Sequence, residues 1–431
     1  MLMNWSQVTN ELSVMLEEYI QIDTSNPPGN EANACEWLKN IALKENIDYR
    51  IIQSEDNRSN FIANINSKLT SEKRIILLNH IDVVPAEEED WNFAPFSGIT
   101  QDNYIHGRGA LDMKGMGIIE LMTLILLHRE NYSKRNIVFL ASADEESGSK
   151  FGVEHLIKNY PELFDASFVI NEGGIGTIDA FGKQEKIFNV GISEKSPCWL
   201  KLEVNGDAGH GSKQTFESAN VRLVHALNRI INHKFDIQIS SEVRQYYSSL
   251  KELNIINDEV NDKFFHSVVK DNSYAHSILT NSIAITQINA GYKNNVVPSI
   301  ASASLDVRLV PGYDPEQFIN ELRIIINDEN ISIEKVFISS TKTSPIDNMA
   351  YNAIENVVKQ LVPDASVVPY VTTGFTDSRV FRRLGVPAYG FMPILVSKDE
   401  LRGIHGVNEK ISLDNLLLGV KVLYHLINQL D

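Results

Sequence analysis

The sequence predicts an α/β fold in which helices cover a mostly parallel sheet. Three apolar runs indicate strands of that sheet: RIILLNH at 74–80, NIVFLAS at 136–142 and FVIN at 168–171. Each run is apolar almost throughout, as expected of a strand that is buried on both faces. A helical pattern over 114–128 separates the first two runs, and this alternation is typical of parallel sheets.

From about Ser193 the pattern changes to an alternation of polar and apolar residues. It is visible in KSPCWLKLEVNGDAGH (195–210), NSIAITQINA (281–290) and ASASLDVRLV (301–310). A period of two predicts an antiparallel sheet with one face exposed to water.

After about residue 340 the chain returns to helix and strand patterns. We therefore expect a discontinuous catalytic domain, 1–190 and 341–431, whose two segments share one sheet. An α+β domain of the lid or dimerisation type would be inserted at 191–340. The polar stretch 239–281 is longer than a minimal lid requires.

Composition narrows the classes of function. The chain has 431 residues and a formal net charge of −17, and no Lys/Arg-rich stripe, so we do not expect a nucleic-acid partner. No segment has the pattern of a signal peptide or a membrane span, which predicts a cytoplasmic protein acting on a small molecule or short peptide. Cys35 and Cys198 are far apart, so any metal would be held by His and carboxylates.

Acidic residues and a histidine follow the predicted strands. His80 and Asp82 come at the end of the first, Glu145 and Glu146 after the second, and Glu172 after the third. The carboxyl ends of parallel strands meet at the edge where open α/β sheets bind ligands. These segments have few basic residues, so we expect metal ions to balance the charge. Oxygen and imidazole ligands suit zinc, with manganese or cobalt as alternatives.

Each residue also has an ordinary interpretation. Asp112 in GRGALDMKG fits a helix N-cap. Glu145 and Glu146 fit a solvated turn, whereas Glu172 in NEGG and His405 in GIHGVNE fit polar loops. The shared placement of these residues, rather than any one of them, indicates a site.

The motifs resemble those of the M20 family of dizinc metallopeptidases and deacylases, which includes carboxypeptidases, aminoacylases and acetylornithine or succinyl-diaminopimelate deacylases. The matching segments run in the family's order over about 75–410: LLNHIDVVP, EEEDWNFAPFSGITQDNYIHGRGALDMKG, ASADEESGS, NEGG, AGHGS, NNVVPS, LDVRLVPG, TGFTDSRVF and IHGVNE. Chance does not plausibly produce such an ordered set.

The resemblance implies two divalent metal ions, with Zn²⁺ preferred over Mn²⁺ or Co²⁺. Asp112 would bridge them. The resemblance makes His80 a ligand of one of the ions. It places Glu146 and His405 together on one ion and Glu172 on the other.

The resemblance also implies metal-assisted amide hydrolysis. In this hypothesis the ions hold a water or hydroxide, with a pKa lowered to about 7. Glu145 is the general base that takes its proton and returns it to the leaving nitrogen. Asp82 would hydrogen-bond the ligating His80, and a cis peptide bond is implied between Asp112 and Met113.

Three lid residues complete the implied site. His210 in DAGHGS would stabilise the oxyanion, either through lid closure or from the neighbouring subunit of a homodimer; otherwise it is an ordinary loop residue. Arg308 in LDVRLVPG would grip a free carboxylate of the substrate, with Asn295 in KNNVVPS beside it. The loop 373–379 resembles the family's substrate loop.

Within the family, Glu172 and Arg308 together favour N-acyl amino acids, or short peptides cut next to their C-terminal residue. Three alternatives stay open. Arg308 could be an ordinary residue of the sheet surface, the specificity could be of the aminopeptidase type, or the protein could be a catalytically retired relative that binds or scaffolds.

Overall fold

The computed structural model describes residues 3–68, 73–180, 185–213 and 216–430. The chain divides into two compact units. Unit 1 comprises Met1–Ile192, Thr343–Tyr370 and Thr376–Asp431, and unit 2 comprises Ser193–Lys342 and Val371–Phe375. Both ends of the chain therefore contribute to unit 1.

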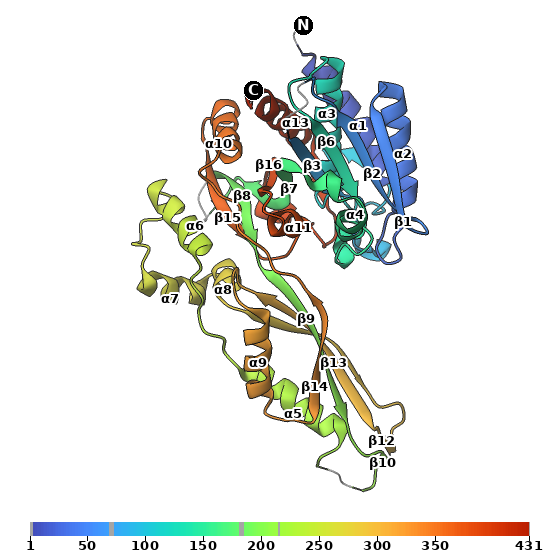
Figure 1. Ribbon diagram of the computed structural model, residues 1–431, viewed down its shortest axis with the longest axis vertical. Coiled ribbons are helices and arrows are strands. Elements are labelled where there is room, and N and C mark those ends of the chain that lie inside the picture. Colours follow the sequence, from blue (N-terminus) through green and yellow to red (C-terminus); the bar gives the residue numbers. More distant parts are fainter. Residues whose placement is uncertain (1–2, 69–72, 181–184, 214–215, 431) are drawn as a thin grey trace. The chain divides into compact units, whose positions relative to one another are not determined.

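Unit 1 is built on an eight-stranded sheet of order β1-β2-β6-β3-β7-β16-β8-β15 (Figure 1). The central strands β6, β3, β7 and β16 run parallel. β2 pairs antiparallel with β1 and β6, and β8 pairs antiparallel with β16. The strands are β1 (Asp48–Glu55), β2 (Arg58–Ile65), β3 (Arg74–His80), β6 (Ile137–Ser142), β7 (Ala166–Thr177), β8 (Lys186–Glu194), β15 (Ala365–Thr372) and β16 (Ala388–Val396).

Helices cover both faces of this sheet. The first face packs against α1 (Trp5–Ile20), α2 (Glu31–Glu45), α3 (Lys114–Arg129), α10 (Met349–Leu361) and α13 (Leu413–Gln429). The second packs against α4 (Val153–Asn159), the 3-10 helix η3 (Pro161–Phe164) and α11 (Ser378–Arg383). Unit 1 is therefore a three-layer α/β structure.

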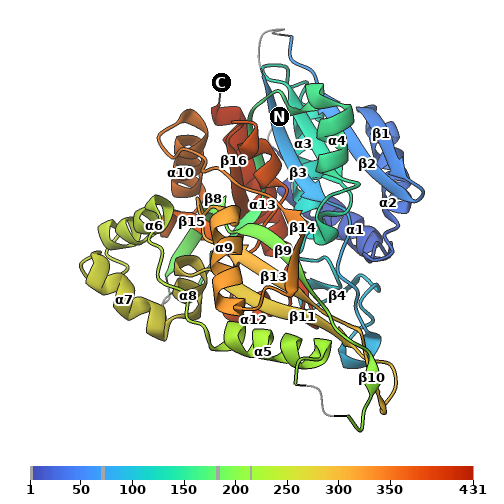
Figure 2. The ribbon, with the colours of Figure 1, turned by 60° about the horizontal axis from the view of Figure 1, so that its bottom comes forward.

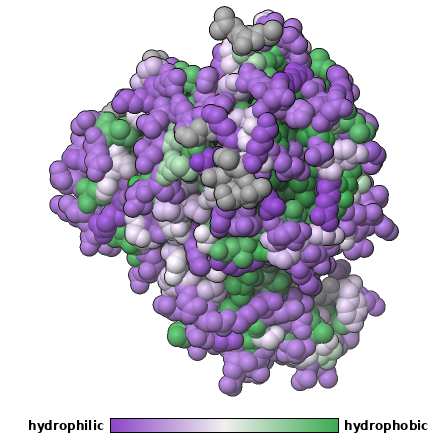
Figure 3. Space-filling model, turned by 45° about the horizontal axis from the view of Figure 1, so that its top comes forward, coloured by the Kyte–Doolittle hydropathy of each residue, from purple (hydrophilic) through white to green (hydrophobic). Residues whose placement is uncertain are grey.

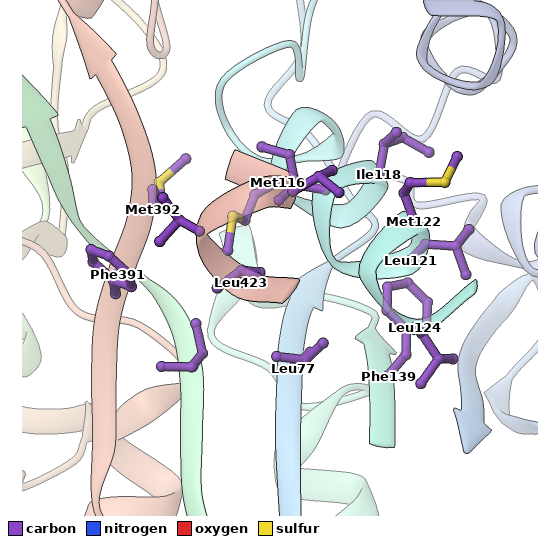
Figure 4. Close-up of a cluster of buried hydrophobic side chains, with 14 of the residues drawn as sticks. Leu77, Met116, Ile118, Leu121, Met122, Leu124, Phe139, Phe391, Met392 and Leu423 are labelled. Atoms are coloured by element: carbon purple, nitrogen blue, oxygen red, sulfur yellow. The ribbon is translucent and has the colours of Figure 1, made fainter. Parts of the chain in front are cut away.

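Successive residues of β3 show why the sequence has no polar alternation there. Leu77 belongs to the hydrophobic cluster on the first face and Leu78 to the cluster on the second, and neither is exposed to solvent. Figure 4 shows part of the first face, where Phe139 of β6 lies next to Leu124 of α3, and Leu77 of β3 lies near Leu423 of α13. A strand buried on both sides is apolar at every position.

A small three-stranded sheet of order β17-β5-β4 also belongs to unit 1. Its strands are β4 (Ile99–Gln101), β5 (Tyr104–His106) and β17 (Lys410–Ser412). Because β17 pairs antiparallel with β5, the chain just after His405 lies beside the chain just before Asp112. The small sheet thus connects two segments that carry predicted site residues.

Unit 2 contains a four-stranded antiparallel sheet of order β11-β13-β9-β14, with α5 and α9 packed against one face (Figure 2). In β9, Leu200 and Leu202 are buried, whereas Trp199 and Lys201 are partly exposed, which confirms the predicted antiparallel sheet with one wet face. The elements are β9 (Ser196–Asn205), β11 (Ser282–Ala290), β13 (Ile300–Leu309), β14 (Ile331–Ile338), α5 (Ala219–Asn232) and α9 (Pro315–Ile326).

The polar stretch 239–281 of unit 2 is largely helical. It forms α6 (Ser241–Glu252), α7 (Asp262–Asp271) and α8 (Ser273–Leu279). The ring of Tyr247 lies 5.1 Å from Phe264 and 5.6 Å from Phe265, edge to face. This segment therefore has an aromatic core of its own, despite its polar composition.

Most of the predicted elements are confirmed. Strands 74–80 and 136–142 and helix 114–128 match β3, β6 and α3, and the parallel pairing of β7 with β16 confirms that both ends of the chain share one sheet. The parallel strand predicted at 168–171 is confirmed as part of β7, but its predicted end is too early, because β7 continues to Thr177. Gly174 and Gly176 belong to the strand, where the backbone of β16 approaches too closely for a Cβ atom.

Within the described ranges, no helix has the length and apolar character needed to cross a membrane. Hydrophilic side chains predominate on the face of the molecule shown in Figure 3, and the hydrophobic ones form smaller patches among them.

Candidate active site

The predicted cluster lies at one edge of the unit 1 sheet. His80 is the last residue of β3, and Glu145 and Glu146 begin a 3-10 helix just after β6. Glu172 lies within β7, on the part of that strand next to the end of β3; the prediction that it follows its strand is wrong, since β7 is longer than expected. Because these strands are parallel, they bring the side chains to one edge.

Two groups of candidate metal ligands meet at this edge, and they share Asp112. The groups are His80, Asp112 and Glu172, and Asp112, Glu146 and His405, with the ligand atoms of each within 4.8 Å of one another. Nε2 of His80 is 3.1 Å from Oδ1 of Asp112, and Nε2 of His405 is 3.1 Å from Oδ2. The two oxygens of one carboxylate therefore face different groups.

Asp112 is carried by the loop that leads into α3. Gly109 in this loop has φ of +88°, a conformation that favours glycine, and the backbone N–H of Asp112 donates to Glu409 at 2.9 Å. The peptide bond between Asp112 and Met113 is cis, which confirms that expectation.

The turn after β6 gives its two adjacent acids different surroundings. Asp144 has φ of 68°, and the carboxylate of Asp82 accepts the backbone N–H groups of Glu145 (3.1 Å) and Glu146 (3.2 Å). Oε2 of Glu146 lies 3.3 Å from Nε2 of His405. Glu145 is only 7% exposed and belongs to neither ligand group. One acid is thus a candidate ligand, and the other is left for a different task.

Asp82 contacts His80 mainly through its main chain. Nδ1 of His80 is 2.8 Å from the carbonyl oxygen of Asp82, and 3.7 Å from its carboxylate. A carbonyl can only accept, so Nδ1 carries a proton, and in the neutral form of the ring Nε2 keeps a free lone pair. This is the tautomer that a metal-binding histidine needs.

Electrostatics at this edge favour a bound cation. Burial, and then the charge of Glu172, raise the pKa of Glu145. Hydrogen bonds to Asp112 and Glu146 raise the pKa of His405 to about 10. Oε1 of Glu145 and Oε1 of Glu146 are buried without a hydrogen-bond partner among the described residues. Clustered carboxylate and imidazole donors of this kind fit divalent ions.

Three buried residues that the sequence did not single out support the site from behind. Nδ2 of Asn26 donates to Asp82 (2.8 Å) and Asp144 (3.0 Å). Arg58 donates to Asp144 at 2.8 Å and forms two hydrogen bonds, of 2.7 and 2.8 Å, with Glu31. None of the three lies in a quoted motif, so no sequence signal marked them.

The loop 373–379 also supports the site. Asp377 is 1% exposed and accepts hydrogen bonds from Ser142 (2.9 Å) and Ser149. Arg379 is fully buried and donates to the carbonyl oxygen of Gly148 at 3.0 Å. These two side chains hold the segment that follows Glu146.

In unit 2, two of the predicted residues come together. The strands β10 (Gly209–His210) and β12 (Val296–Val297) pair, and the N–H of Gly211 donates to the carbonyl oxygen of Asn295 at 2.8 Å. His210 is exposed, and its Nδ1 accepts the N–H of Ser212 at 3.2 Å. The ring proton of a neutral His210 is therefore on Nε2.

Arg308 lies away from this pair. Along β13, Ile300 pairs with Asn205 at the end of β9, whereas Arg308 pairs with Pro197 near its start. Asn295 precedes β13 by five residues, so it lies at the other end of the sheet. Within one chain, the prediction that Asn295 lies beside Arg308 is therefore wrong.

The guanidinium of Arg308 is held on the polar face of the sheet. Its Nε and Nη2 donate to Asp306 at 2.7 and 2.9 Å, and its Cζ is 4.7 Å from the ring centroid of Phe375. Trp199 also donates to Asp306, at 2.9 Å. These contacts fix the orientation of the guanidinium.

The fold and the unit 1 site define a metallohydrolase, because two ligand groups that share a carboxylate, with a separate buried acid, are the parts of a two-metal hydrolytic centre. The family model described as "Peptidase family M20/M25/M40" matches residues 76–429. The chain belongs to this family, and it is an enzyme acting on amide or peptide bonds.

Individual relatives agree. The human N-fatty-acyl-amino acid synthase/hydrolase PM20D1 is 30% identical over 372 residues, which cover 83% of this chain and 74% of that protein. The probable carboxypeptidase S-like 2 of Dictyostelium discoideum is 30% identical over 382 residues, covering 83% and 72%. The M20 family metallo-carboxypeptidase Sso-CP2 from Sulfolobus solfataricus shares the fold, with a TM-score of 0.77, 20% identity, and coverage of 97% and 99%.

Proposed function

We propose that this enzyme hydrolyses the amide or peptide bond next to a residue with a free carboxylate. Its substrates would be N-acyl amino acids, or short peptides cut at the C-terminal residue. The observation that carries the hydrolytic part is the position of Glu145, which is buried at the ligand edge but belongs to neither group. The ions would be Zn²⁺, with Mn²⁺ or Co²⁺ as alternatives, held by His80, Asp112, Glu146, Glu172 and His405.

When bound, the ions supply positive charge that activates a water molecule and polarises the substrate carbonyl. Glu145 accepts the proton of the attacking water and delivers it to the leaving nitrogen. Burial, and then Glu172, raise the pKa of Glu145, which makes this carboxylate a better proton acceptor than an exposed one. Asp82 holds the backbone of the turn, so Glu145 and Glu146 keep their separate roles.

In this proposal, His210 donates a hydrogen bond to the oxyanion of the tetrahedral intermediate. A tetrahedral oxyanion needs a hydrogen-bond donor, and Nε2 of His210 is a donor because Nδ1 accepts from Ser212. The exposure of His210 leaves that nitrogen accessible.

The proposal assigns the substrate carboxylate to Arg308. Asp306 already binds two of its nitrogens, so the guanidinium is oriented before substrate arrives. A guanidinium suits a planar anion, and an oriented one loses less entropy on binding.

These assignments together require a second copy of the chain. The part of β13 from Ile300 to Arg308 has eight residue-to-residue steps and spans about 26 Å, which is longer than a short substrate. If His210 and Arg308 contact one substrate, then they come from different copies. Support for a homodimer through unit 2 comes from exposed apolar residues, Val224 (63%) and Ile231 (69%) of α5.

The experiment is to compare an N-acyl amino acid with its carboxamide as substrates of the zinc- or manganese-loaded enzyme. We expect the acid to be the better substrate by about 10- to 100-fold in kcat/KM, the value of a charged hydrogen bond. Arg308→Met should remove this preference, mainly through KM. The matched control is Arg222→Met, which removes another paired arginine of unit 2 and should keep the preference.

Three outcomes would contradict the proposal. Equal cleavage of acid and carboxamide would remove the role of Arg308. Cleavage only of substrates with a free amino terminus would indicate aminopeptidase-type specificity. No cleavage of any substrate would favour the binding or scaffolding alternative.

A further inference from the structure

Glu409 is a fully buried carboxylate outside both ligand groups. Its Oε1 accepts the backbone N–H groups of Leu111 (2.7 Å) and Asp112 (2.9 Å). Its Oε2 accepts the backbone N–H of Gly109 at 2.9 Å and Nη1 of Arg108 at 2.7 Å. Four donors from the loop that carries Asp112 therefore converge on one side chain.

The same contacts extend to the segment that carries His405. Nη2 of Arg108 donates to the carbonyl oxygen of Gly406 at 2.7 Å, and the backbone N–H of Gly107 donates to the carbonyl oxygen of Glu409 at 2.9 Å. Glu409 lies four residues after His405. The side chain thus joins two segments that are about 300 residues apart in sequence, each with a candidate metal ligand.

We propose that Glu409 is a positioning residue that fixes Asp112 relative to His405 and thereby sets the affinity of the ion between them. This inference rests on the proposed metal site. Both ligand groups include Asp112, but only one includes His405. The loss of Glu409 would therefore weaken the ion of the Asp112, Glu146 and His405 group more than the other ion.

The geometry requires a carboxylate at position 409. Each oxygen of Glu409 accepts two N–H groups, so both ends of the side chain must be acceptors. In Glu409→Gln, the amide NH₂ would face donors, and at least one pair of hydrogen bonds would be lost. The substitution keeps the volume, so it tests the hydrogen bonds and not the packing.

The test is calorimetric titration of the metal-stripped full-length protein with Zn²⁺, in the presence of a competing chelator. The wild type should bind two ions per chain. In Glu409→Gln, one binding step should weaken by about 10- to 100-fold, the usual effect of removing a residue that orients a metal ligand, and the other should change much less. At limiting zinc kcat should fall with KM unchanged, and excess zinc should restore it.

One further variant serves as a control, and another replaces Glu409→Gln if that protein does not fold. Glu120→Gln changes another fully buried carboxylate of unit 1, which accepts the amide of Asn79 at 2.8 Å and is in neither group; both binding steps should be unchanged. If Glu409→Gln does not fold, Arg108→Gln carries the test, because it removes one charged donor to Glu409 and leaves the main-chain bonds. It should weaken the same step to a smaller degree.

Wild-type affinity for both ions in Glu409→Gln would overturn the positioning role alone. If only Arg108→Gln folds, wild-type affinity for both ions in that variant would overturn the role. A loss of zinc affinity in Glu120→Gln equal to that in Glu409→Gln would also overturn it. A wild-type protein that binds no zinc would overturn this inference and the proposed function together.

Discussion

The two units hold their functional candidates in opposite ways. In unit 1, buried side chains and main-chain hydrogen bonds fix the cluster: His80 is 2% exposed and Asp82 holds the backbone of two acids. In unit 2, His210 and Asn295 are exposed beside a two-residue ladder. The difference teaches that the fold of unit 1 by itself holds its candidate ligands in place, whereas in our proposal the residues of unit 2 act only with a substrate or a second copy.

The largest effect is expected from a variant that removes the proposed general base of unit 1 and leaves its candidate metal ligands unchanged. Glu145→Gln should lower kcat by about 10²- to 10⁴-fold, the range for a general base, and should still bind two ions. Steady-state kinetics and metal analysis check both statements. The comparison variant Glu172→Gln changes a candidate ligand and should lose metal as well as activity. Metal loss in Glu145→Gln would place Glu145 among the ligands.

The next effect concerns unit 2. His210→Ala should lower kcat by about 10²- to 10³-fold, as expected for an oxyanion donor. If a second copy supplies His210, a mixture of Glu145→Gln and His210→Ala should regain about a quarter of wild-type activity, because half of the randomly mixed dimers contain one intact site. Activity assays after co-refolding provide the measurement, and a mixture as inactive as its components would show that each chain uses its own His210.

Whether a site residue could be predicted from the sequence depends on how far apart in sequence it and its contact partners lie. His80, Glu145 and Glu146 follow apolar strands, and the parallel order of those strands predicted a common edge. Glu409 and Asn26 could not be assigned a role, because Glu409 acts through N–H groups 297 residues away and Asn26 through a carboxylate 56 residues away. The separation of Asn295 from Arg308 could not be predicted either, since short sequence motifs do not show how far apart two residues lie along a sheet.

Among the described residues of unit 2, Lys195 is a buried lysine, in contrast to the exposed His210 and Asn295. Nζ of Lys195 donates to the carbonyl oxygen of Thr280 (2.9 Å) and to Ser282 (3.0 Å). Burial, and then the charge of Arg308, lower the pKa of Lys195 to about 7, against the opposing effect of Asp306. The folded state therefore binds fewer protons than the unfolded state between about pH 7 and the ordinary lysine pKa.

Stability should consequently rise with pH across that window, by about 1.4 kcal/mol per pH unit from this one group. Lys195→Met should lack this contribution, so its free energy of unfolding should gain less between pH 7.5 and about 9.5 than that of the wild type. Urea unfolding at several pH values provides the test. Parallel pH profiles for the two proteins would contradict a lowered pKa.

The smallest expected effect is a difference in thiol reactivity between the cysteine of unit 1 and that of unit 2. Cys35 of unit 1 and Cys198 of unit 2 are both fully buried, and burial raises the pKa of Cys198 to about 11. Neither thiol should react with a thiol reagent at about pH 8 in the native protein. In mild denaturant we expect Cys198 to react first, since the core of unit 2 is smaller; prior reaction of Cys35, mapped by mass spectrometry, would reverse that order.

The central claim is that unit 1 holds two metal ions that share Asp112. The most direct measurement is the number of ions bound per chain, by elemental analysis after equilibrium dialysis against zinc, for the wild type, His405→Ala and Asp112→Ala. The account predicts two ions for the wild type, one for His405→Ala, and the loss of both tightly bound ions from Asp112→Ala. A wild type with a single ion, or an Asp112→Ala variant that keeps two, would contradict it.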